Sequence, residues 1–287
     1  MAVQIKTQNI TTRRTWHASA QIDQHDQTNF PVRPDCRILI CLLGDFRVLK
    51  QGQPIKILSG SKIETLLCSL ALKQEYCALR DVLLNTLWPN TQTPFAAQSL
   101  NSLVYSLNKL LSDGVGGAPS VVYDDSAYRL NVEAGVGVDV ENFQILAHAG
   151  QARERAGDRS NAVMLYSRAI QLYRGDLRAG TDVQVVMERE RLRALYLTLL
   201  AHIADYSYAQ GDYATCLESA LALLANDPYR EDAHRLLMRC YVRNGERAQA
   251  LRQYKLCEQI LRAEFNAAPE PSTRALYDLI RLNPDRV

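Results

Sequence analysis

Hydrophobic residues repeat at helical spacing from Ala96 to Leu111, in the segment AAQSLNSLVYSLNKLL. This period predicts a helix with one buried stripe, made of Leu100, Leu103, Val104, Leu107, Leu110 and Leu111. The opposite stripe carries amides, hydroxyls and one cation: Gln98, Asn101, Ser102, Tyr105, Ser106, Asn108 and Lys109. Such a stripe has the groups that hydrogen-bond to DNA base edges, but little of the positive charge that draws a protein to DNA.

The residues before this helix predict a small antiparallel sheet and two further helices. A continuous apolar run, CRILICLL, begins at Cys36 and is typical of a buried strand, and apolar stretches at 46–49 and 54–58 flank a Gln-Gly-Gln turn. Helices are predicted over 61–72, with Ser59 or Ser61 as its N-cap, and over 79–87, where Trp88-Pro89 ends it.

A hairpin is predicted after the polar-faced helix, with strands over 120–123 and 127–131 around Asp124-Asp125-Ser126. Strands, three helices and a terminal hairpin, in this order, predict a winged helix-turn-helix domain over residues 36–132. The expected fold class is mainly α with a small antiparallel β component.

The second half of the chain contains a repeat. Gly157, Gly211 and Gly245 each precede a similar helix, and the last two are 34 residues apart, the tetratricopeptide period. Positions 5, 9 and 12 after each glycine carry mostly small residues or tyrosine: Ala162, Tyr166, Ala169, Cys216, Ala220, Leu223, Ala250, Tyr254 and Cys257. Residues 139–281 are therefore predicted to form a tetratricopeptide-like α-solenoid whose concave side holds a partner or ligand.

Composition narrows the class of protein. A chain of 287 residues is long enough for two domains, and its net charge is +2. The seven cysteines form no C-x-x-C pair, so we expect reduced thiols and no metal site. Neither a signal-peptide core nor an apolar run of about 18 residues occurs, which favours a soluble, cytoplasmic protein without membrane contact.

Catalytic and nucleotide-binding motifs are missing from the sequence. It has no Walker A motif, no G-x-G-x-x-G and no G-x-S-x-G, and its five histidines are scattered. We therefore expect no enzymatic activity and no cofactor.

Several segments resemble one family. Leu43-Gly44-x-Phe46-x-Val48, the helix that contains Lys62, Leu87-Trp88-Pro89, the helix SLNSLVYSLNKLL and Tyr128-Arg129-Leu130 are similar, in this order, to the DNA-binding domain of the Streptomyces antibiotic regulatory protein family. In that family a bacterial transcriptional activator domain follows the winged helix. The resemblance covers about residues 38 to 281 and implies a DNA-binding transcriptional regulator.

The predicted winged domain departs from the family in its charge. Residues 36–132 contain nine Lys and Arg against seven Asp and Glu. Members usually carry V-S-R-L-R-R late in the recognition helix, where this chain has VYSLNK, so Ser106 and Asn108 replace two cations. Asp124 and Asp125 at the predicted wing tip would face phosphates. We expect weak DNA binding unless a second copy, as in a homodimer, or a protein partner supplies charge.

The polar N-terminal arm, residues 1–35, is either a floppy tail or a second anion site. Arg13 and Arg14 lie beside Trp16 and His17, and guanidiniums next to an aromatic ring suit phosphates and purines. The arrangement resembles that of PilZ-type receptors, whose arginines bind cyclic di-GMP while a carboxylate contacts guanine. The chain also resembles the cyanobacterial cyclic di-GMP receptors built on this architecture. The predicted ligand set is completed by Arg33 and Asp35, with Asp23 and Asp26 as other candidate carboxylates.

Three hypotheses follow. The first is a signal receptor that binds an anionic nucleotide, cyclic di-GMP foremost, through the arm and relays it to a protein partner such as a transcription factor. The second is a DNA-binding transcriptional activator that reads DNA through Gln98, Asn101, Ser102, Tyr105 and Lys109. The third is a tetratricopeptide scaffold with an inert winged domain.

Overall fold

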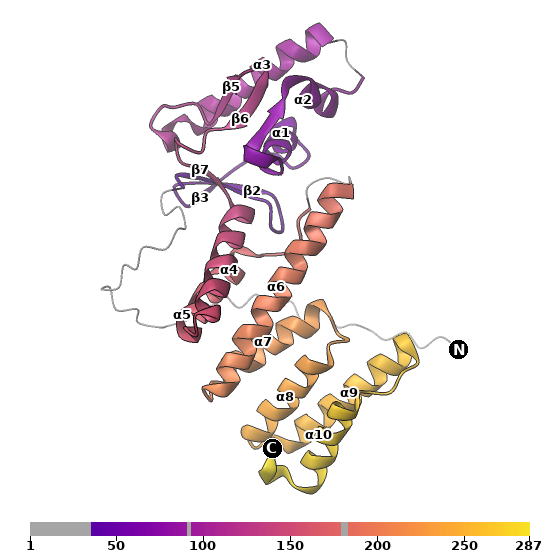
Figure 1. The fold of residues 1–287 in the computed structure, drawn as a ribbon. Coiled ribbons are helices and arrows are strands. Elements are labelled where there is room, and N and C mark those ends of the chain that lie inside the picture. Colours follow the sequence, from indigo (N-terminus) through magenta and orange to yellow (C-terminus); the bar gives the residue numbers. More distant parts are fainter. Residues whose placement is uncertain (1–35, 91–92, 179–182) are drawn as a thin grey trace. The chain divides into compact units, whose positions relative to one another are not determined.

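Four short strands form the first sheet, in the order β3-β2-β1-β7 (Figure 1). The computed structural model describes residues 36–90, 93–178 and 183–287. In it, β1 (Ile38–Cys41) pairs antiparallel with β2 (Arg47–Lys50), which pairs antiparallel with β3 (Gln53–Ile55). The other neighbour of β1 is β7 (Val136–Val138), and this pair is parallel. The predicted turn between β2 and β3 is confirmed, with Gly52 at a φ of +79° that favours glycine.

Three helices follow: α1 (Lys62–Ala71), α2 (Arg80–Leu87) and α3 (Thr93–Leu111). Ser61 caps α1 by accepting a hydrogen bond from the backbone N–H of Glu64, so one of the two predicted N-caps is confirmed. Lys62 donates through Nζ to the carbonyl of Leu87 at 2.6 Å and lies 4.3 Å from the centre of the Trp88 ring. Lys62 thus binds the C-terminal end of α2 to α1.

The second sheet has the order β4-β6-β5 and contains the predicted hairpin. Its hairpin strands β5 (Val121–Asp124) and β6 (Ala127–Leu130) are joined by Asp125 and Ser126, both in the left-handed region as a tight hairpin turn requires. The sequence did not reveal β4 (Cys77–Leu79) or β7, because a three-residue strand is too short to show a period and forms only against a partner strand.

Seven helices of the described residues follow the sheets, and each packs on the next along the chain (Figure 1). They are α4 (Asp139–Arg155), α5 (Arg159–Leu172), α6 (Val183–Ala209), α7 (Tyr213–Asn226), α8 (Glu231–Arg243), α9 (Arg247–Phe265) and α10 (Pro271–Leu282). Short 3₁₀ turns occupy Gln74–Tyr76, Ser112–Val115 and Pro284–Arg286. The predicted fold class, a winged helix-turn-helix followed by a tetratricopeptide-like solenoid, is confirmed.

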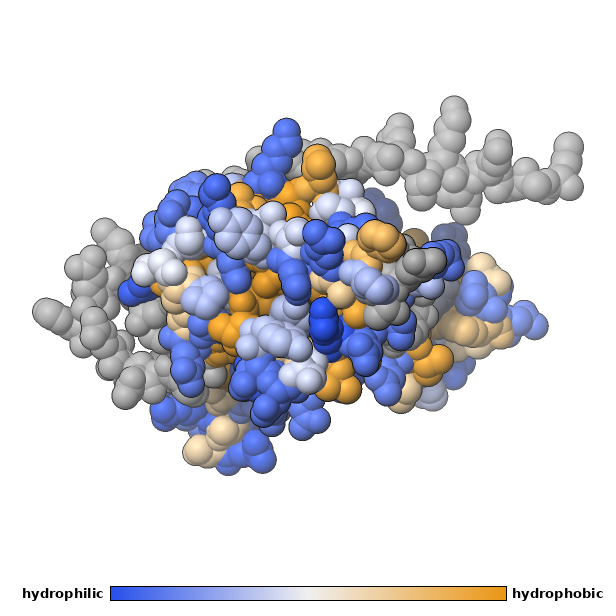
Figure 2. All heavy atoms as spheres, turned by 90° about the horizontal axis from the view of Figure 1, so that it is seen from above, coloured by the Kyte–Doolittle hydropathy of each residue, from blue (hydrophilic) through white to orange (hydrophobic). Residues whose placement is uncertain are grey.

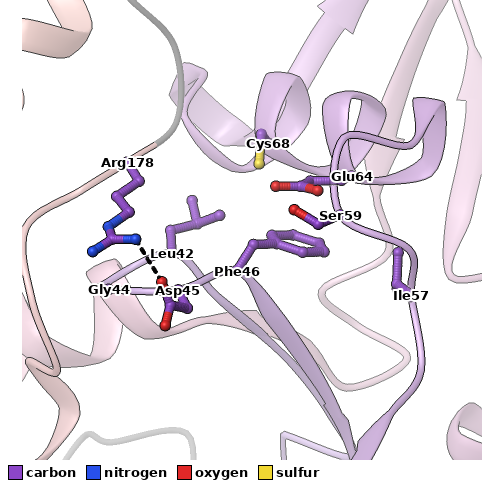
Figure 3. Close-up of a pocket in the computed structure, with 9 residues that line it drawn as sticks. All are labelled: Leu42, Gly44, Asp45, Phe46, Ile57, Ser59, Glu64, Cys68 and Arg178. Atoms are coloured by element: carbon purple, nitrogen blue, oxygen red, sulfur yellow. Dashed lines mark hydrogen bonds and ion pairs between the residues drawn. The ribbon is translucent and has the colours of Figure 1, made fainter.

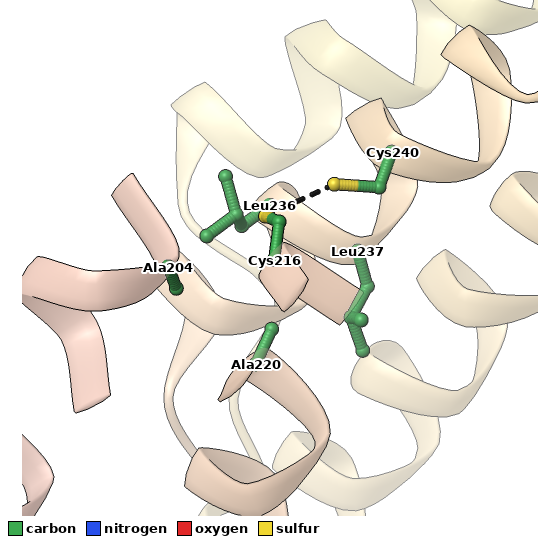
Figure 4. Packing of buried hydrophobic residues seen from close by; sticks show 6 residues of the cluster. All are labelled: Ala204, Cys216, Ala220, Leu236, Leu237 and Cys240. Carbon is green, nitrogen blue, oxygen red and sulfur yellow. Dashed lines mark hydrogen bonds between the residues drawn. The ribbon is translucent and has the colours of Figure 1, made fainter. Parts of the chain in front are cut away.

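The predicted repeat sets the packing of these helices. All nine residues at positions 5, 9 and 12 after the three glycines are buried. Gly157, Gly211 and Gly245 have φ values from +77° to +83° and end the preceding helices. Figure 4 shows one resulting cluster, in which Ala204 of α6 and Cys216 and Ala220 of α7 meet Leu236, Leu237 and Cys240 of α8. Small side chains in such clusters let neighbouring helices approach closely.

A buried carboxylate connects the first sheet to the first solenoid helix. Asp139, in the first turn of α4, is 1 % exposed. Its Oδ1 accepts from the backbone N–H of Leu42 at 2.8 Å and its Oδ2 from that of Leu43 at 3.1 Å. Burial raises the pKa of Asp139 to about 6, although these N–H groups act in the opposite direction. The carboxylate therefore holds the chain where it leaves β1.

Contacts of the loop after α5 extend this connection. The N–H of Gly44 donates to the carbonyl of Asp176 at 3.3 Å, and Leu43 forms an isolated β-bridge with Leu177.

Strand β7 lies between the two predicted domains in sequence yet pairs with β1. The boundaries at 36–132 and 139–281 stay a prediction. No helix in the described ranges is both long and apolar enough to span a bilayer.

We predict that Asp139→Ala lowers the free energy of unfolding, because the N–H groups of Leu42 and Leu43 lose their acceptors at a cost of about 1 to 3 kcal/mol each. The raised pKa means that the folded state binds the proton more tightly than the unfolded chain does. The proton-linked part of the contribution of Asp139 is thus fully present below pH 3.8 and is lost as the pH rises through about 6, whereas the hydrogen bonds to Leu42 and Leu43 do not require the proton.

Urea unfolding of both proteins at several pH values between 4 and 7 measures this difference, which should shrink as the pH rises. Asp278→Ala is the matched control, because Asp278 lies in an exposed ion pair with Arg281 and its loss should cost at most about 1 kcal/mol. Equal stability of wild type and Asp139→Ala at pH 5 would contradict the role given to Asp139.

Candidate nucleic-acid interface

Helix α3 is fixed by its apolar stripe. Leu100, Val104, Leu107 and Leu111 are buried, as predicted. Leu110 was placed in the same stripe but is 41 % exposed, because its position on the helix lies at the border of the stripe. Leu103, the remaining member of the predicted stripe, is half-buried, and the four buried residues orient α3 so that its opposite side chains face outward.

The five predicted DNA-reading residues lie on the outward face of α3. Gln98, Asn101, Ser102, Tyr105 and Lys109 are all exposed, and each is one, three or four residues from the next. The largest of these side chains, Tyr105, is 71 % exposed. Figure 2 views the molecule from the side on which α3 lies in Figure 1, and it shows hydrophilic side chains around smaller hydrophobic patches.

Asn108 was predicted on the outward polar stripe of α3, but its side chain contacts the first strand of the wing. Its Nδ2 donates to the carbonyl of Val121 at 2.9 Å, and the N–H of Val121 donates to its Oδ1 at 2.8 Å. The side chain therefore completes the backbone hydrogen bonds at the start of β5. Where family members usually carry a cation, this chain therefore has an amide that joins α3 to the wing.

A second hydrogen bond joins α3 to the wing. The hydroxyl of Tyr128, on β6, donates to Oδ1 of Asn101 at 2.9 Å. Tyr128 is 4 % exposed, and its ring lies 4.7 Å from that of Tyr123 on β5. Burial raises the pKa of Tyr128, so the phenol stays protonated at neutral pH. The amide of Asn101 thus has one end fixed by a buried donor.

Charge on this surface is sparse. Lys109 is the only cation in α3 and Arg129 is the only one in the wing hairpin. Arg129 lies 3.6 Å from the carboxylate of Asp124, and Asp125 is exposed at the wing tip. The interface offers hydrogen-bonding groups and an aromatic ring, with one cation on the helix to meet phosphates.

The arm residues proposed to bind a nucleotide lie outside the described residues. They are Arg13, Arg14, Trp16, His17, Arg33 and Asp35. Their assignment stays a prediction.

A pocket of about 370 Å³ lies beside the junction between sheet and solenoid (Figure 3). Its charged groups already have partners: Asp45 pairs with Arg178 at 2.7 Å, and Glu64 accepts from the N–H of Gly60 at 2.7 Å. Burial raises the pKa of Cys68 to about 12, so its thiol is not ionised. The pocket therefore lacks the unpaired cations that a phosphate ligand needs.

No cluster of three or more potential metal ligands occurs among the residues described by the structure.

Comparison with known proteins identifies the family. The model of the bacterial transcriptional activator domain matches residues 138–281, half of the chain. The chain belongs to the Streptomyces antibiotic regulatory protein family. Regulatory protein AfsR of Streptomyces coelicolor is 29 % identical over 240 residues, which are 83 % of this chain but only 24 % of AfsR. The chain thus spans about a quarter of the length of AfsR, which is named as a regulatory protein.

Two mycobacterial members of the family match over most of the chain. Transcriptional regulatory protein MoaR1 of Mycobacterium tuberculosis is 27 % identical over 83 % of this chain and 78 % of its own length. A solved structure of Mycobacterium tuberculosis EmbR, in complex with a low-affinity phosphopeptide, superimposes with a TM-score of 0.61 at 23 % identity. It covers 87 % of this chain and 67 % of EmbR, and it supports the fold.

The sequence did not reveal the roles of three residues. Two of them join α3 to the wing, and the third joins β1 to α4. Tyr128 and Asn108 were seen as parts of motifs, but their partners lie 27 and 13 residues away. Asp139 had one available signal, an acidic residue at the start of a predicted helix. That signal suggests a helix terminus and does not reveal that the side chain reaches back to β1.

We predict that Asn108→Ala lowers the free energy of unfolding by about 1 to 3 kcal/mol, because the N–H and C=O of Val121 lose their partner. The measurement is thermal or denaturant unfolding monitored by circular dichroism. Ser106→Ala is the control on the same helix, since Ser106 is exposed and its loss should change stability by at most about 0.5 kcal/mol. Two variants of equal stability would contradict the role of Asn108.

Proposed function

We propose that this chain is a DNA-binding transcriptional regulator in which α3 enters the major groove and the β5–β6 hairpin forms the wing. The observation that carries the proposal is the outward face of α3, where all five predicted DNA-reading side chains are exposed while the apolar stripe anchors the helix. Family membership supports it, because the matched relatives are named as regulatory proteins. A recognition helix of this kind presents side chains to base edges.

The same surface predicts weak binding by a single copy. Lys109 is the only cation of α3, and in the wing Arg129 is shared with Asp124. Since phosphate contacts supply most of the non-specific affinity, a second copy or a protein partner would add what one copy lacks. We place such a protein partner on the solenoid, whose stacked helices form extended surfaces.

Replacing Lys109 by Ala should reduce the salt dependence of DNA binding. One lost phosphate contact changes the slope of log K against log salt by about 0.9. The converse variant, Ser106→Arg, should steepen the slope by a similar amount, because Ser106 is exposed on the same face. Fluorescence anisotropy of a labelled promoter duplex, titrated at several salt concentrations, measures both slopes.

Lys255→Ala is the control for this measurement. Lys255 also carries one positive charge but lies on α9, where it pairs with Glu258 at 3.3 Å. If Lys109→Ala and Lys255→Ala alter the slope equally, only the net charge of the protein matters and α3 is not the contact surface. If the wild-type protein prefers no sequence, the chain is not a sequence-specific regulator.

We also propose a second candidate, in which the N-terminal arm binds cyclic di-GMP. It is motivated by the sequence, where the guanidiniums of Arg13 and Arg14 adjoin the Trp16 ring. Titration calorimetry with cyclic di-GMP should show binding to the wild-type protein and none to the Arg13→Ala/Arg14→Ala double variant. Binding that survives the double substitution excludes the arm as the site, and no binding by the wild type excludes the ligand.

A further inference from the structure

One polar side chain on the outward face of α3 is positioned by the interior of the protein. Asn101 is exposed, whereas the Tyr128 hydroxyl that donates to its Oδ1 belongs to a residue only 4 % exposed. Tyr128 is itself held by the sheet, because its strand pairs with β4 on one side and β5 on the other. The position of this donor is therefore set by the wing and not by solvent.

An asparagine reads adenine through both ends of its amide. Oδ1 accepts from the N6 amino group while Nδ2 donates to N7. A free asparagine amide reaches either orientation by a half-turn about its terminal torsion, and only one orientation matches adenine. Because the donor bond from Tyr128 uses one lone pair of Oδ1, it places the oxygen on the wing side and leaves the second lone pair and Nδ2 available to a base.

The neighbouring side chains on α3 favour the same kind of base pair. Guanine is most often read by arginine or lysine, and α3 contains no arginine and a single lysine near its end. Tyr105 is 71 % exposed and Phe95 is 65 % exposed, and aromatic edges pack against the methyl group of thymine. The face thus has an amide for adenine and apolar groups for thymine.

We propose that α3 selects an A·T-rich site, in which Asn101 contacts an adenine and the buried Tyr128 acts as a positioning residue for that contact. The proposal rests on the proposed function, since it specifies which DNA the winged domain reads. Tyr128 does not touch DNA in this arrangement. It determines which end of the Asn101 amide meets the base.

The test is selection of binding sites from duplexes with a random central segment, using the full chain. The wild-type protein should enrich A·T-rich sequences. Asn101→Ala should reduce the preference for adenine at a single position by about 5- to 100-fold while other positions keep theirs. Tyr128→Phe removes only the hydroxyl and should weaken the preference at that same position several-fold, with an unchanged salt slope, because Lys109 is retained.

Tyr123→Phe is the matched control on the neighbouring strand. It removes a hydroxyl from the ring that packs on Tyr128 and should leave the base preference at every position intact. Circular dichroism at the binding temperature confirms that each variant is folded. If Tyr128→Phe is unfolded, Asn101→Asp decides, because a carboxylate accepts from the cytosine N4 amino group and should move the preference from adenine to cytosine.

Three outcomes separate this inference from the proposed function. A selected site that is G·C-rich, or one whose preferences are the same for wild type and Asn101→Ala, overturns the inference and leaves the DNA-binding function standing. Enrichment of no sequence at all overturns both. A position-specific loss shared by Asn101→Ala and Tyr128→Phe, and absent from Tyr123→Phe, supports the inference.

Discussion

The connection between winged helix and solenoid depends on one buried carboxylate. Asp139 accepts hydrogen bonds from the backbone N–H groups of Leu42 and Leu43, which follow the end of β1. Burying these groups unpaired would cost more than most single contacts contribute, so the carboxylate is required wherever the chain follows this path. The parallel pairing of β7 with β1 directly precedes Asp139, and together they bring the start of α4 to the end of β1.

Side-chain hydrogen bonds that join separate elements recur in the winged domain. Lys62 caps the end of α2, Asn108 pairs with β5, and Tyr128 reaches α3 from β6. Each joins elements whose bonded residues lie well apart in sequence, and the bond from Tyr128 also orients the exposed side chain of Asn101. The result is a recognition helix held firmly by its neighbours although it has few cations. Such a surface suits selection by hydrogen bonds and shape more than capture by electrostatic attraction.

The solenoid is stabilised by a different principle. Its repeats rely on small buried residues and left-handed glycines, and the sulfur atoms of Cys216 and Cys240 lie 3.1 Å apart inside one of the clusters (Figure 4). Gly150 shows how close the packing is, because a methyl group there would lie 2.4 Å from the ring of Tyr166. Packing of this kind fixes the spacing of successive helices and presents their outer faces as a continuous surface.

The sequence alone determined the elements whose signal is local. The stripe of α3, the Ser61 cap, the hairpin and the glycine repeat follow from periodicity and turn chemistry, which act over a few residues. Tertiary structure alone decided what depends on distant partners. The strands β4 and β7 are too short to be detected from the sequence. The bonds of Asn108 to Val121 and of Asp139 to the end of β1 appear only once these distant residues are placed beside each other. Hydrogen bonds between residues far apart in sequence leave no periodic trace, because only the folded chain brings donor and acceptor together.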